Sequence, residues 1–266
     1  MITRKTPQEI AHLREGGRRL AAILAHLARE IKPGMSALEL DTIGHDMIIA
    51  GRATDGTPDA PAFLGYQPES AHSPYPASVC ISINNEIVHG IPTAEKIFAE
   101  GDVVAIDSGL VHEGLITDSA VTVIVGKHPD AAQAKRDKAL VKATREALEK
   151  GIAAIRPGGH VGDIGAAIEA YARPLGYGIV EQLAGHGVGY AVHEDPYVPN
   201  TGTAGKGDEL VPGMVIAIEP MLAEGTSKVS FDRDGYTVRT KDGSRAAHFE
   251  HTVVITEDGY EVLTKK

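Results

Sequence analysis

The stretch from residue 101 to residue 126 constrains the fold most, because it holds two runs of β-branched and apolar residues on either side of His-Glu-Gly. Such runs, joined by a short turn, are typical of a β-hairpin. If His112 and Glu113 form the turn, Asp107 and Asp118 lie opposite each other, with Cβ atoms about 5 Å apart. Like charges placed in this way destabilise a sheet, so a divalent cation between them is the natural partner. A longer loop that includes Gly114 is the alternative register, and two solvated surface aspartates are the alternative to a metal site.

Composition limits the class of protein and its surroundings. The chain has 266 residues, of which 42% are apolar and 23% charged, so we expect a globular protein with one large domain or two fused halves. It has no apolar run long enough to span a membrane, and its first residues lack the apolar segment of a signal peptide. The single cysteine, Cys80, excludes an internal disulfide framework, which favours the cytoplasm. The net charge of −10 argues against binding to nucleic acid.

Helix signals occur in pairs along the chain. Thr6-Pro-Gln-Glu9 and Ser36-Ala-Leu-Glu39 are capping boxes, which mark helix starts. We expect four helices, at about 7–31, 36–51, 131–150 with a stop at Gly151, and 161–175. Residues 52–77 read as an irregular loop. Residues 78–83 alternate between apolar and small polar side chains, which predicts a strand with one face on a pocket.

The two halves of the chain resemble each other. Ile31-Lys-Pro-Gly precedes one helix start, and Ile155-Arg-Pro-Gly precedes another 124 residues later. Each half then reads as helix, Pro-Gly break, helix and strands. We therefore expect a single catalytic domain, 1–266, made of two duplicated halves, roughly 1–126 and 127–266. Sheets packed together at such a pseudo-twofold leave a central cleft, which is a preferred place for a ligand.

Five further residues can do chemistry. His89 lies beside glycine and proline, His186 lies between two glycines, and His193 precedes Glu-Asp-Pro. Glu219 ends one apolar strand and Glu250 begins another, and a glutamate buried there needs a partner. On a straight strand His186 and His193 would face opposite ways, so we expect them to have different roles. A lone buried histidine or glutamate is more often a satisfied hydrogen-bonding residue than a ligand.

Three of these residues, gathered in one cleft with the two aspartates of the hairpin, would form an oxygen-rich site with one imidazole. Its members would be Asp107, Asp118, His186, Glu219 and Glu250. This donor set suits two first-row divalent ions better than one structural zinc, which prefers cysteine and histidine. Two such ions can share a bridging hydroxide and polarise a carbonyl group, which is hydrolase chemistry.

Several motifs together identify a family. They are Ser-Val-Cys-Ile-Ser-Ile-Asn with His89-Gly-Ile-Pro, Gly-Asp-Val-Val-Ala-Ile-Asp107, Thr-Asp118, Gly-His186-Gly-Val-Gly with His193-Glu-Asp-Pro, Pro-Gly-Met-Val-Ile-Ala-Ile-Glu219-Pro and Phe-Glu250-His-Thr. With them the chain resembles the type I methionine aminopeptidases over nearly its whole length. The resemblance implies an α+β pita-bread (creatinase/aminopeptidase) fold, in which helices cover antiparallel sheets around a central metal cleft. It also implies two divalent metal ions, Co, Mn, Fe(II) or Zn.

The resemblance implies roles for individual residues. Asp107, Asp118 and Glu250 would hold the first ion, and Asp107 and Asp118 would be shared with a second ion completed by His186, Glu219 and Glu250. A metal-activated hydroxide would attack the first peptide bond, and Glu219 would take a proton from the attacking water. His89 and His193 would contact the substrate and stabilise the tetrahedral intermediate.

The substrate pocket is where the chain departs from the family. We expect it to be lined by Phe63, Tyr66, Tyr75, Cys80, Val192 and Tyr236, with His89 and His193. Relatives commonly carry a cysteine in place of Phe63 and an aromatic residue in place of Val192. We therefore expect the Phe63 ring to fill the space vacated at Val192. Residues 67–74 would form a lid, or else be a tolerated surface insertion.

The function implied is removal of the initiator methionine from nascent proteins when the second residue is small. The partners would be nascent polypeptide N-termini, at or away from the ribosome, with no nucleic acid or membrane, and the protein would be a monomer in the cytoplasm. An Xaa-Pro peptidase such as a prolidase or aminopeptidase P is the first alternative, although those enzymes usually carry a substantial domain ahead of the catalytic one. A non-catalytic binding protein of the same fold is the second alternative, although it would be expected to have lost ligands.

Overall fold

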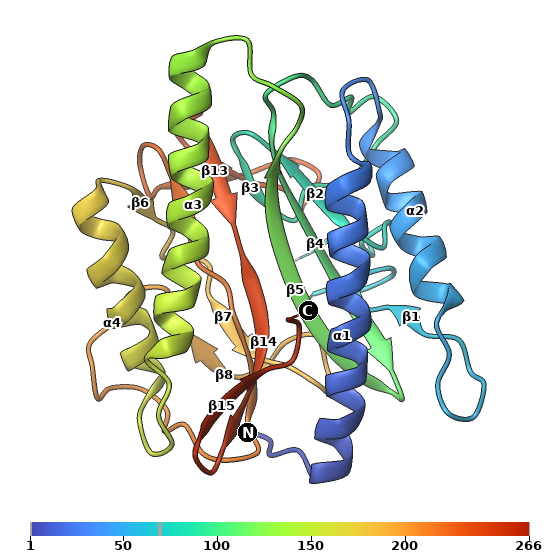
Figure 1. The fold of residues 1–266 in the computed structure, drawn as a ribbon, viewed down its shortest axis with the longest axis vertical. Helices are drawn as coiled ribbons and strands as arrows, with labels where there is room; N and C mark the ends of the chain where they lie inside the picture. Colours follow the sequence, from blue (N-terminus) through green and yellow to red (C-terminus); the bar gives the residue numbers. More distant parts are fainter. Residues whose placement is uncertain (1, 69–70, 266) are drawn as a thin grey trace.

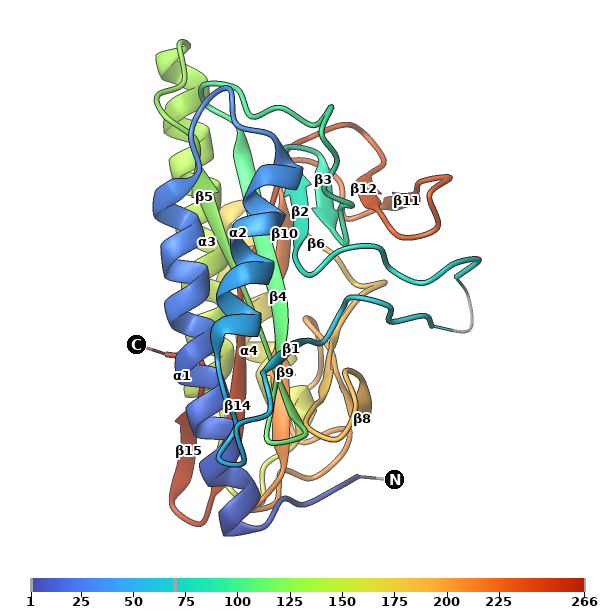
Figure 2. The same ribbon diagram turned by 90° about the vertical axis from the view of Figure 1, so that its right-hand side faces the viewer.

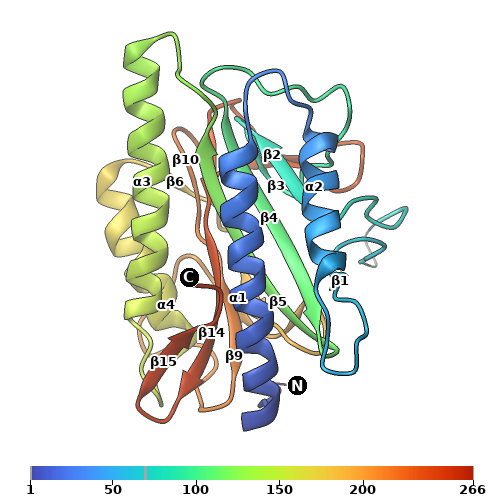
Figure 3. The same cartoon turned by 45° about the vertical axis from the view of Figure 1, so that its right-hand side comes forward.

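Four helices lie over a large antiparallel sheet in the computed structural model, which describes residues 2–68 and 71–265. The helices are α1 (Pro7–Glu30), α2 (Ala37–Ala50), α3 (Ala131–Ala153) and α4 (Val161–Ala172), followed by the short 3₁₀ helix η1 (Arg173–Leu175). Helices α1 and α3 lie side by side across the long strands, with α2 next to α1 and α4 next to α3 (Figures 1 and 3). No helix in the described part of the chain is long and apolar enough to cross a membrane.

Nine strands form the main sheet. Seven of them follow the order β1-β4-β5-β14-β9-β7-β8, while β15 pairs with β14 and β2 pairs with β4. Their bounds are β1 (Ala60–Pro61), β2 (Cys80–Ile83), β4 (Val103–His112), β5 (Leu115–Ile124), β7 (Gly185–Gly187), β8 (Glu194–Val198), β9 (Val215–Ile218), β14 (Glu250–Thr256) and β15 (Gly259–Val262).

Two smaller sheets complete the molecule. One has the order β13-β10-β6, from β13 (Ala246–His248), β10 (Met221–Ala223) and β6 (Gly178–Ile179). The other has the order β11-β12-β3, from β11 (Val229–Phe231), β12 (Val238–Thr240) and β3 (Glu86–Val88). Strands β2, β3, β11 and β12 lie on the side of the long strands away from α1 (Figure 2).

The hydrophobic core decides which face of the sheet is left for a site. Val104 and Ile106 of β4 pack in one buried cluster with Leu20 and Leu24 of α1. Because side chains alternate along a strand, Asp107 must point to the opposite face, away from the helices. A second buried cluster joins α3 and α4 to β9 and β14, and it likewise covers the helical face.

The register of the β4–β5 hairpin differs from the predicted one. Asp107 lies opposite Ala120, and Asp118 lies opposite Gly109. The turn consists of Glu113 and Gly114, with φ of +51° and +75°, instead of His112 and Glu113. Two positive φ values define the type I′ turn that matches the twist of a hairpin, and glycine suits its second position. The two aspartates are therefore diagonal neighbours on one face and not directly opposite.

Both predicted capping boxes are present, at Thr6 and at Ser36. Two smaller expectations were wrong. Helix α3 continues past Gly151, because this residue lies where α3 meets α4 and a Cβ there would come within 2.9 Å of the Ile168 side chain. The predicted loop 52–77 contains the short strand β1. The helix predicted at 161–175 is present, as α4 followed by a last 3₁₀ turn, η1. The division into two halves at about residue 126 stays a prediction.

Candidate metal centre and adjoining pocket

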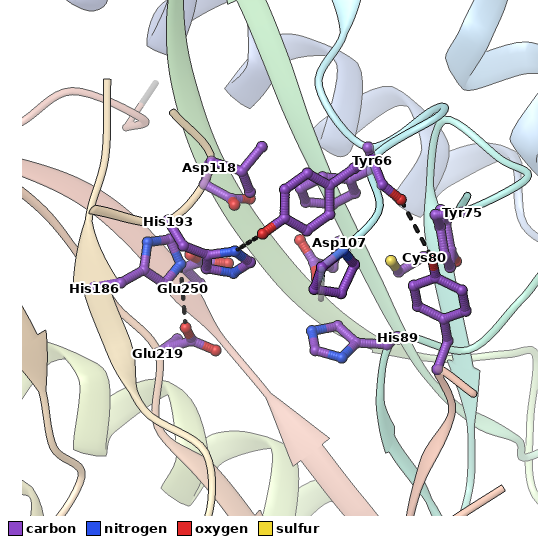
Figure 4. Close-up of a pocket in the computed structure, with 14 residues that line it drawn as sticks. Tyr66, Tyr75, Cys80, His89, Asp107, Asp118, His186, His193, Glu219 and Glu250 are labelled. Carbon is purple, nitrogen blue, oxygen red and sulfur yellow. Dashed lines mark hydrogen bonds and ion pairs between the residues drawn. The ribbon is translucent and has the colours of Figure 1, made fainter. Parts of the chain in front are cut away.

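The five predicted metal ligands come from five neighbouring strands. Strands β4, β5, β14, β9 and β7 follow one another in the sheet. They supply, in that order, Asp107, Asp118, Glu250, Glu219 (directly after the last residue of β9) and His186. All five line one cavity of about 100 Å³, and they point toward one another in Figure 4. The antiparallel pairing thus brings residues up to 143 positions apart into one cluster.

The cluster has the unsatisfied oxygen atoms that a cation requires. Asp107 Oδ1, Asp118 Oδ1 and Glu250 Oε1 are buried and have no hydrogen-bond partner. Ligand atoms of Asp118, His186 and Glu250 lie within 4.8 Å of one another. Among the described residues that line the cavity, none is a lysine or an arginine. Since buried carboxylates without partners are costly, the residues fit divalent metal ions held mainly by oxygen.

Burial and mutual repulsion change the acidity of this cluster. Burial first, and then the charges of Asp118 and Glu219, raise the pKa of Asp107 well above its usual value. Burial and the charge of Asp118 do the same to the pKa of Glu219. Burial followed by neighbouring carboxylates raises the pKa of Glu250, and burial raises the pKa of Asp118 to about 7. Four carboxyl groups in this state would be ionised together only with a compensating positive charge nearby.

The tautomer of His186 suits a metal ligand. Its Nδ1 lies 2.9 Å from the carbonyl oxygen of Gly187, so Nδ1 carries the proton and donates it. That leaves Nε2 as a lone-pair donor, 3.5 Å from Glu219 Oε1. The glycines on either side are needed, because a Cβ at position 185 or 187 would come within 2.2 Å of a backbone carbonyl oxygen of Ala217 or Asp195.

His193 lies on the same side of the cavity as His186, contrary to the expectation that they face opposite ways. Their ring centroids are 4.4 Å apart. The reason is that the chain turns after β7 and His193 directly precedes β8, so the two residues are not on one straight strand. Nδ1 of His193 lies 2.7 Å from the hydroxyl oxygen of Tyr66 (Figure 4).

His89 also lines the cavity, at the end of β3, where its φ is +58°. Burial first, and then the neighbouring His193, lower the pKa of His89 to about 4. Burial also lowers the pKa of His193. Both rings are therefore neutral near pH 7 and can serve as hydrogen-bond donors or acceptors.

An apolar pocket adjoins the metal cluster. All six predicted pocket residues line the same cavity: Phe63, Tyr66, Tyr75, Cys80, Val192 and Tyr236. The rings of Tyr75 and Tyr236 meet edge to face with centroids 5.0 Å apart. Pro68, from the predicted lid 67–74, lines the cavity too, whereas residues 69–70 of that segment lie outside the described residues. Compensation between Phe63 and Val192 stays a prediction.

Sequence reasoning missed His248. This residue is buried, and its Nε2 lies 3.4 Å from Glu219 Oε2, on the side of the carboxylate away from His186. Burial lowers its pKa to about 3, so the ring is neutral. A signal was available, because His248 comes only two residues before the candidate ligand Glu250 in the sequence.

Helices over antiparallel strands, with a carboxylate-rich centre beside an apolar pocket, define a class of metal-dependent peptidases. The model of metallopeptidase family M24 matches residues 11–257. The chain therefore belongs to metallopeptidase family M24, whose members use divalent metal.

The particular relatives are methionine aminopeptidases. The chain is 46% identical to the methionine aminopeptidase of Aquifex aeolicus over 97% of this chain and 96% of that protein. It is 43% identical to methionine aminopeptidase 1 of Mycobacterium tuberculosis, over 99% and 95% of the two chains. A methionine aminopeptidase structure from Thermotoga maritima superposes with a TM-score of 0.91 at 44% identity, covering 100% of both chains. These matches confirm the resemblance and the pita-bread fold predicted from the sequence.

A prolidase structure from Pyrococcus horikoshii has a TM-score of 0.74 at 23% identity. The match covers 99% of this chain but only 63% of the prolidase. At this identity the likeness shows the shared fold alone, and it gives no support to an Xaa-Pro peptidase.

Proposed function

We propose that this chain removes the N-terminal methionine from polypeptides whose second residue is small. The observation that carries the proposal is the meeting of five candidate ligands from five neighbouring strands beside an apolar pocket. The relatives named as methionine aminopeptidases, matched over nearly the full length of both chains, support the same activity.

Two divalent ions, drawn from Co, Mn, Fe(II) or Zn, would be held by the five ligands. Asp118 and Glu250 lie between the other ligands, since both group with His186 and Asp118 also contacts Asp107. Asp107, Asp118 and Glu250 would hold one ion, and His186 and Glu219 would complete the second. When bound, such ions polarise the peptide carbonyl and make a water molecule acidic enough to react near neutral pH.

Glu219 would act as the proton acceptor. Its carboxylate faces the cavity, and neutral imidazoles of His186 and His248 flank it at 3.5 and 3.4 Å. A carboxylate beside the attacking water can take its proton and pass it to the departing amine. His248 would hold the carboxylate in place for this transfer.

His193 and His89 would bind the substrate. When the Tyr66 hydroxyl donates to Nδ1 of His193, the neutral ring keeps its proton on Nε2. That proton can be donated to the carbonyl oxygen as negative charge develops there. His89, which directly follows β3, would contact the same substrate from the side of the cavity where Cys80 and Tyr75 lie (Figure 4).

The pocket suits a methionine side chain. Its walls combine aromatic rings with the thiol of Cys80, and thioethers make favourable contacts with aromatic rings. The cavity is well below the several hundred Å³ typical of sites for larger ligands, so it accepts one side chain and not an extended peptide. We further propose that the substrates are nascent chains and that the protein acts as a cytoplasmic monomer.

Competition among three peptides tests the proposal. The metal-loaded protein should cleave Met-Ala-Ser well, should cleave Met-Lys-Ser at least tenfold less well, and should leave Ala-Pro-Ser uncut. Preference for Ala-Pro-Ser would establish an Xaa-Pro peptidase instead. Binding of methionyl peptides without cleavage of any of them would indicate a non-catalytic protein of the same fold.

A further inference from the structure

A second group of metal-ligating side chains lies at the tip of the β4–β5 hairpin, away from the cavity. It consists of His12 from α1, His112 from the end of β4 and Glu113 from the turn, and we call it the hairpin-tip cluster. One ligand atom from each residue lies within 4.8 Å of the other two. None of the three lines the cavity that holds the metal centre described above.

His112 is oriented as metal-bound histidines are. Its Nδ1 lies 2.8 Å from Oδ1 of the buried Asp59. The other oxygen of Asp59 accepts from Arg19 Nη1 at 2.8 Å, which holds this carboxylate in place. The arrangement holds the Nδ1 proton of His112 toward Asp59 and leaves Nε2 as the free donor atom. A carboxylate–histidine pair of this kind is the usual support behind a metal ligand.

Glu113 presents one carboxylate oxygen to the cluster. The backbone N–H of Thr54 donates to Oε1 at 2.5 Å, while Oε2 lies 3.9 Å from His12 Nδ1. The bond from Thr54 lowers the pKa of Glu113, so the carboxylate is charged. The type I′ turn, with φ of +51° at this residue, places the side chain next to α1.

Solvent can reach the cluster on one side. The His112 side chain is 6% exposed, whereas those of Glu113 and His12 are 19% and 26% exposed. His112 is thus a buried ligand held in place, whereas the more exposed side chains of His12 and Glu113 can change position. Ligand atoms bound to one tetrahedral zinc ion lie about 3.4 Å apart, so the 3.9 Å between His12 Nδ1 and Glu113 Oε2 needs to shorten by about 0.5 Å.

We propose that the hairpin-tip cluster binds one divalent ion of the zinc type, with His12, His112 and Glu113 as ligands and water in the fourth position. Two imidazoles and one carboxylate are a donor set for zinc and neighbouring transition ions, and not for magnesium or calcium, which take oxygen ligands. The ion would join α1 to the tip of the hairpin that carries Asp107 and Asp118. In the structure His12 Nδ1 lies 3.9 Å from Glu113 Oε2, and the His12 and His112 ring centroids are 6.5 Å apart.

Counting zinc in matched variants tests the site independently of peptidase activity. The experiment compares four proteins: wild type, His12→Gln, Glu113→Gln and the control His26→Gln. Each is stripped of metal with a chelator and then dialysed against zinc ions buffered at about 1 μM, a concentration chosen to fill a site of moderate affinity. His26 is a suitable control because it also lies on α1, with its Nε2 3.9 Å from Glu30, but no third ligand groups with it among residues 2–68 and 71–265. Zinc per chain is then measured by elemental analysis.

Wild type and His26→Gln should each hold one zinc more per chain than His12→Gln and Glu113→Gln. Cleavage of Met-Ala-Ser by the two tip variants, loaded with metal at the catalytic centre, should stay within about twofold of wild type, since their changes lie outside the cavity. Equal zinc content in all four proteins would overturn the proposal, as would an equal loss in His26→Gln. A failure of peptidase activity in every variant would contradict the proposed function and leave the zinc count valid.

Discussion

At the scale of single residues, the site depends on two histidines that lie close together but make different contacts. Nε2 of His186 points at the carboxylate cluster, while Nδ1 of His193 contacts the Tyr66 hydroxyl. His186→Ala should therefore reduce metal content, and His193→Ala should lower kcat by about 100-fold or more with metal content almost intact. Elemental analysis measures the metal content of each variant, and steady-state kinetics measures its kcat. Equal metal loss in the two variants would refute the division of roles.

Residue types alone pointed to the five side chains that meet in the cavity, because each stands out against its neighbours. Glu219 and Glu250 adjoin apolar strands, and His186 lies between glycines whose missing Cβ atoms let two strands approach. His248 was not recognised, since a histidine beside Phe249 looks like an ordinary core residue until the strand pairing places it against Glu219.

At the scale of elements, the hairpin register is the feature that local sequence left open. Two-residue turns at His112-Glu113 and at Glu113-Gly114 place Asp107 opposite Asp118 and Ala120 respectively, and both keep the two aspartates on one face. The tertiary structure selects the Glu113-Gly114 turn, in which Glu113 also receives a hydrogen bond from Thr54. Local sequence could not select between the two turns, because Thr54, which bonds to Glu113, lies 59 positions away in the chain.

Gly114→Ala tests the register. In the structure Gly114 has a φ of +75°, so alanine should destabilise the protein by about 1 kcal/mol. If the turn were His112-Glu113, Gly114 would lie in a strand, and alanine would be neutral or stabilising. Urea unfolding at fixed metal concentration measures the difference. A Gly114→Ala protein as stable as its parent would contradict the observed turn.

At the scale of the whole molecule, the buried carboxylates link stability to metal and pH. Their pKa values are raised in the folded state, so their contribution to stability is present at low pH and is lost as pH rises through the folded pKa. The buried histidines have lowered pKa values in the folded state, so their contribution to stability is lost as pH falls. This loss begins only below their unfolded pKa of about 6.5. Above pH 6.5 the carboxyl groups alone set the slope.

Protein stripped of metal should therefore lose stability as pH rises from 6.5 to 8. Asp118, whose folded pKa is about 7, stops contributing near that pH, whereas Asp107, Glu219 and Glu250, whose pKa values are raised further, continue to contribute. The expected slope is about 1.4 kcal/mol per pH unit for each carboxyl group that is still protonated in the folded protein and ionised in the unfolded chain. Added divalent metal should remove the slope, because it binds the ionised form. Unfolding midpoints with and without chelator give the comparison, and equal slopes in both conditions would show that the carboxylates do not meet as a cluster.

The central claim is that this cluster binds the metal on which peptide cleavage depends. The most direct measurement is the rate of Met-Ala-Ser hydrolysis by chelator-stripped protein, before and after single divalent metals are added under reducing, anaerobic conditions, with metal content determined by elemental analysis. Activity should vanish with the metal and return when metal is restored, and Asp107→Asn should remain several orders of magnitude less active in either state. Full activity in chelator, with no metal found in the protein, would contradict the account.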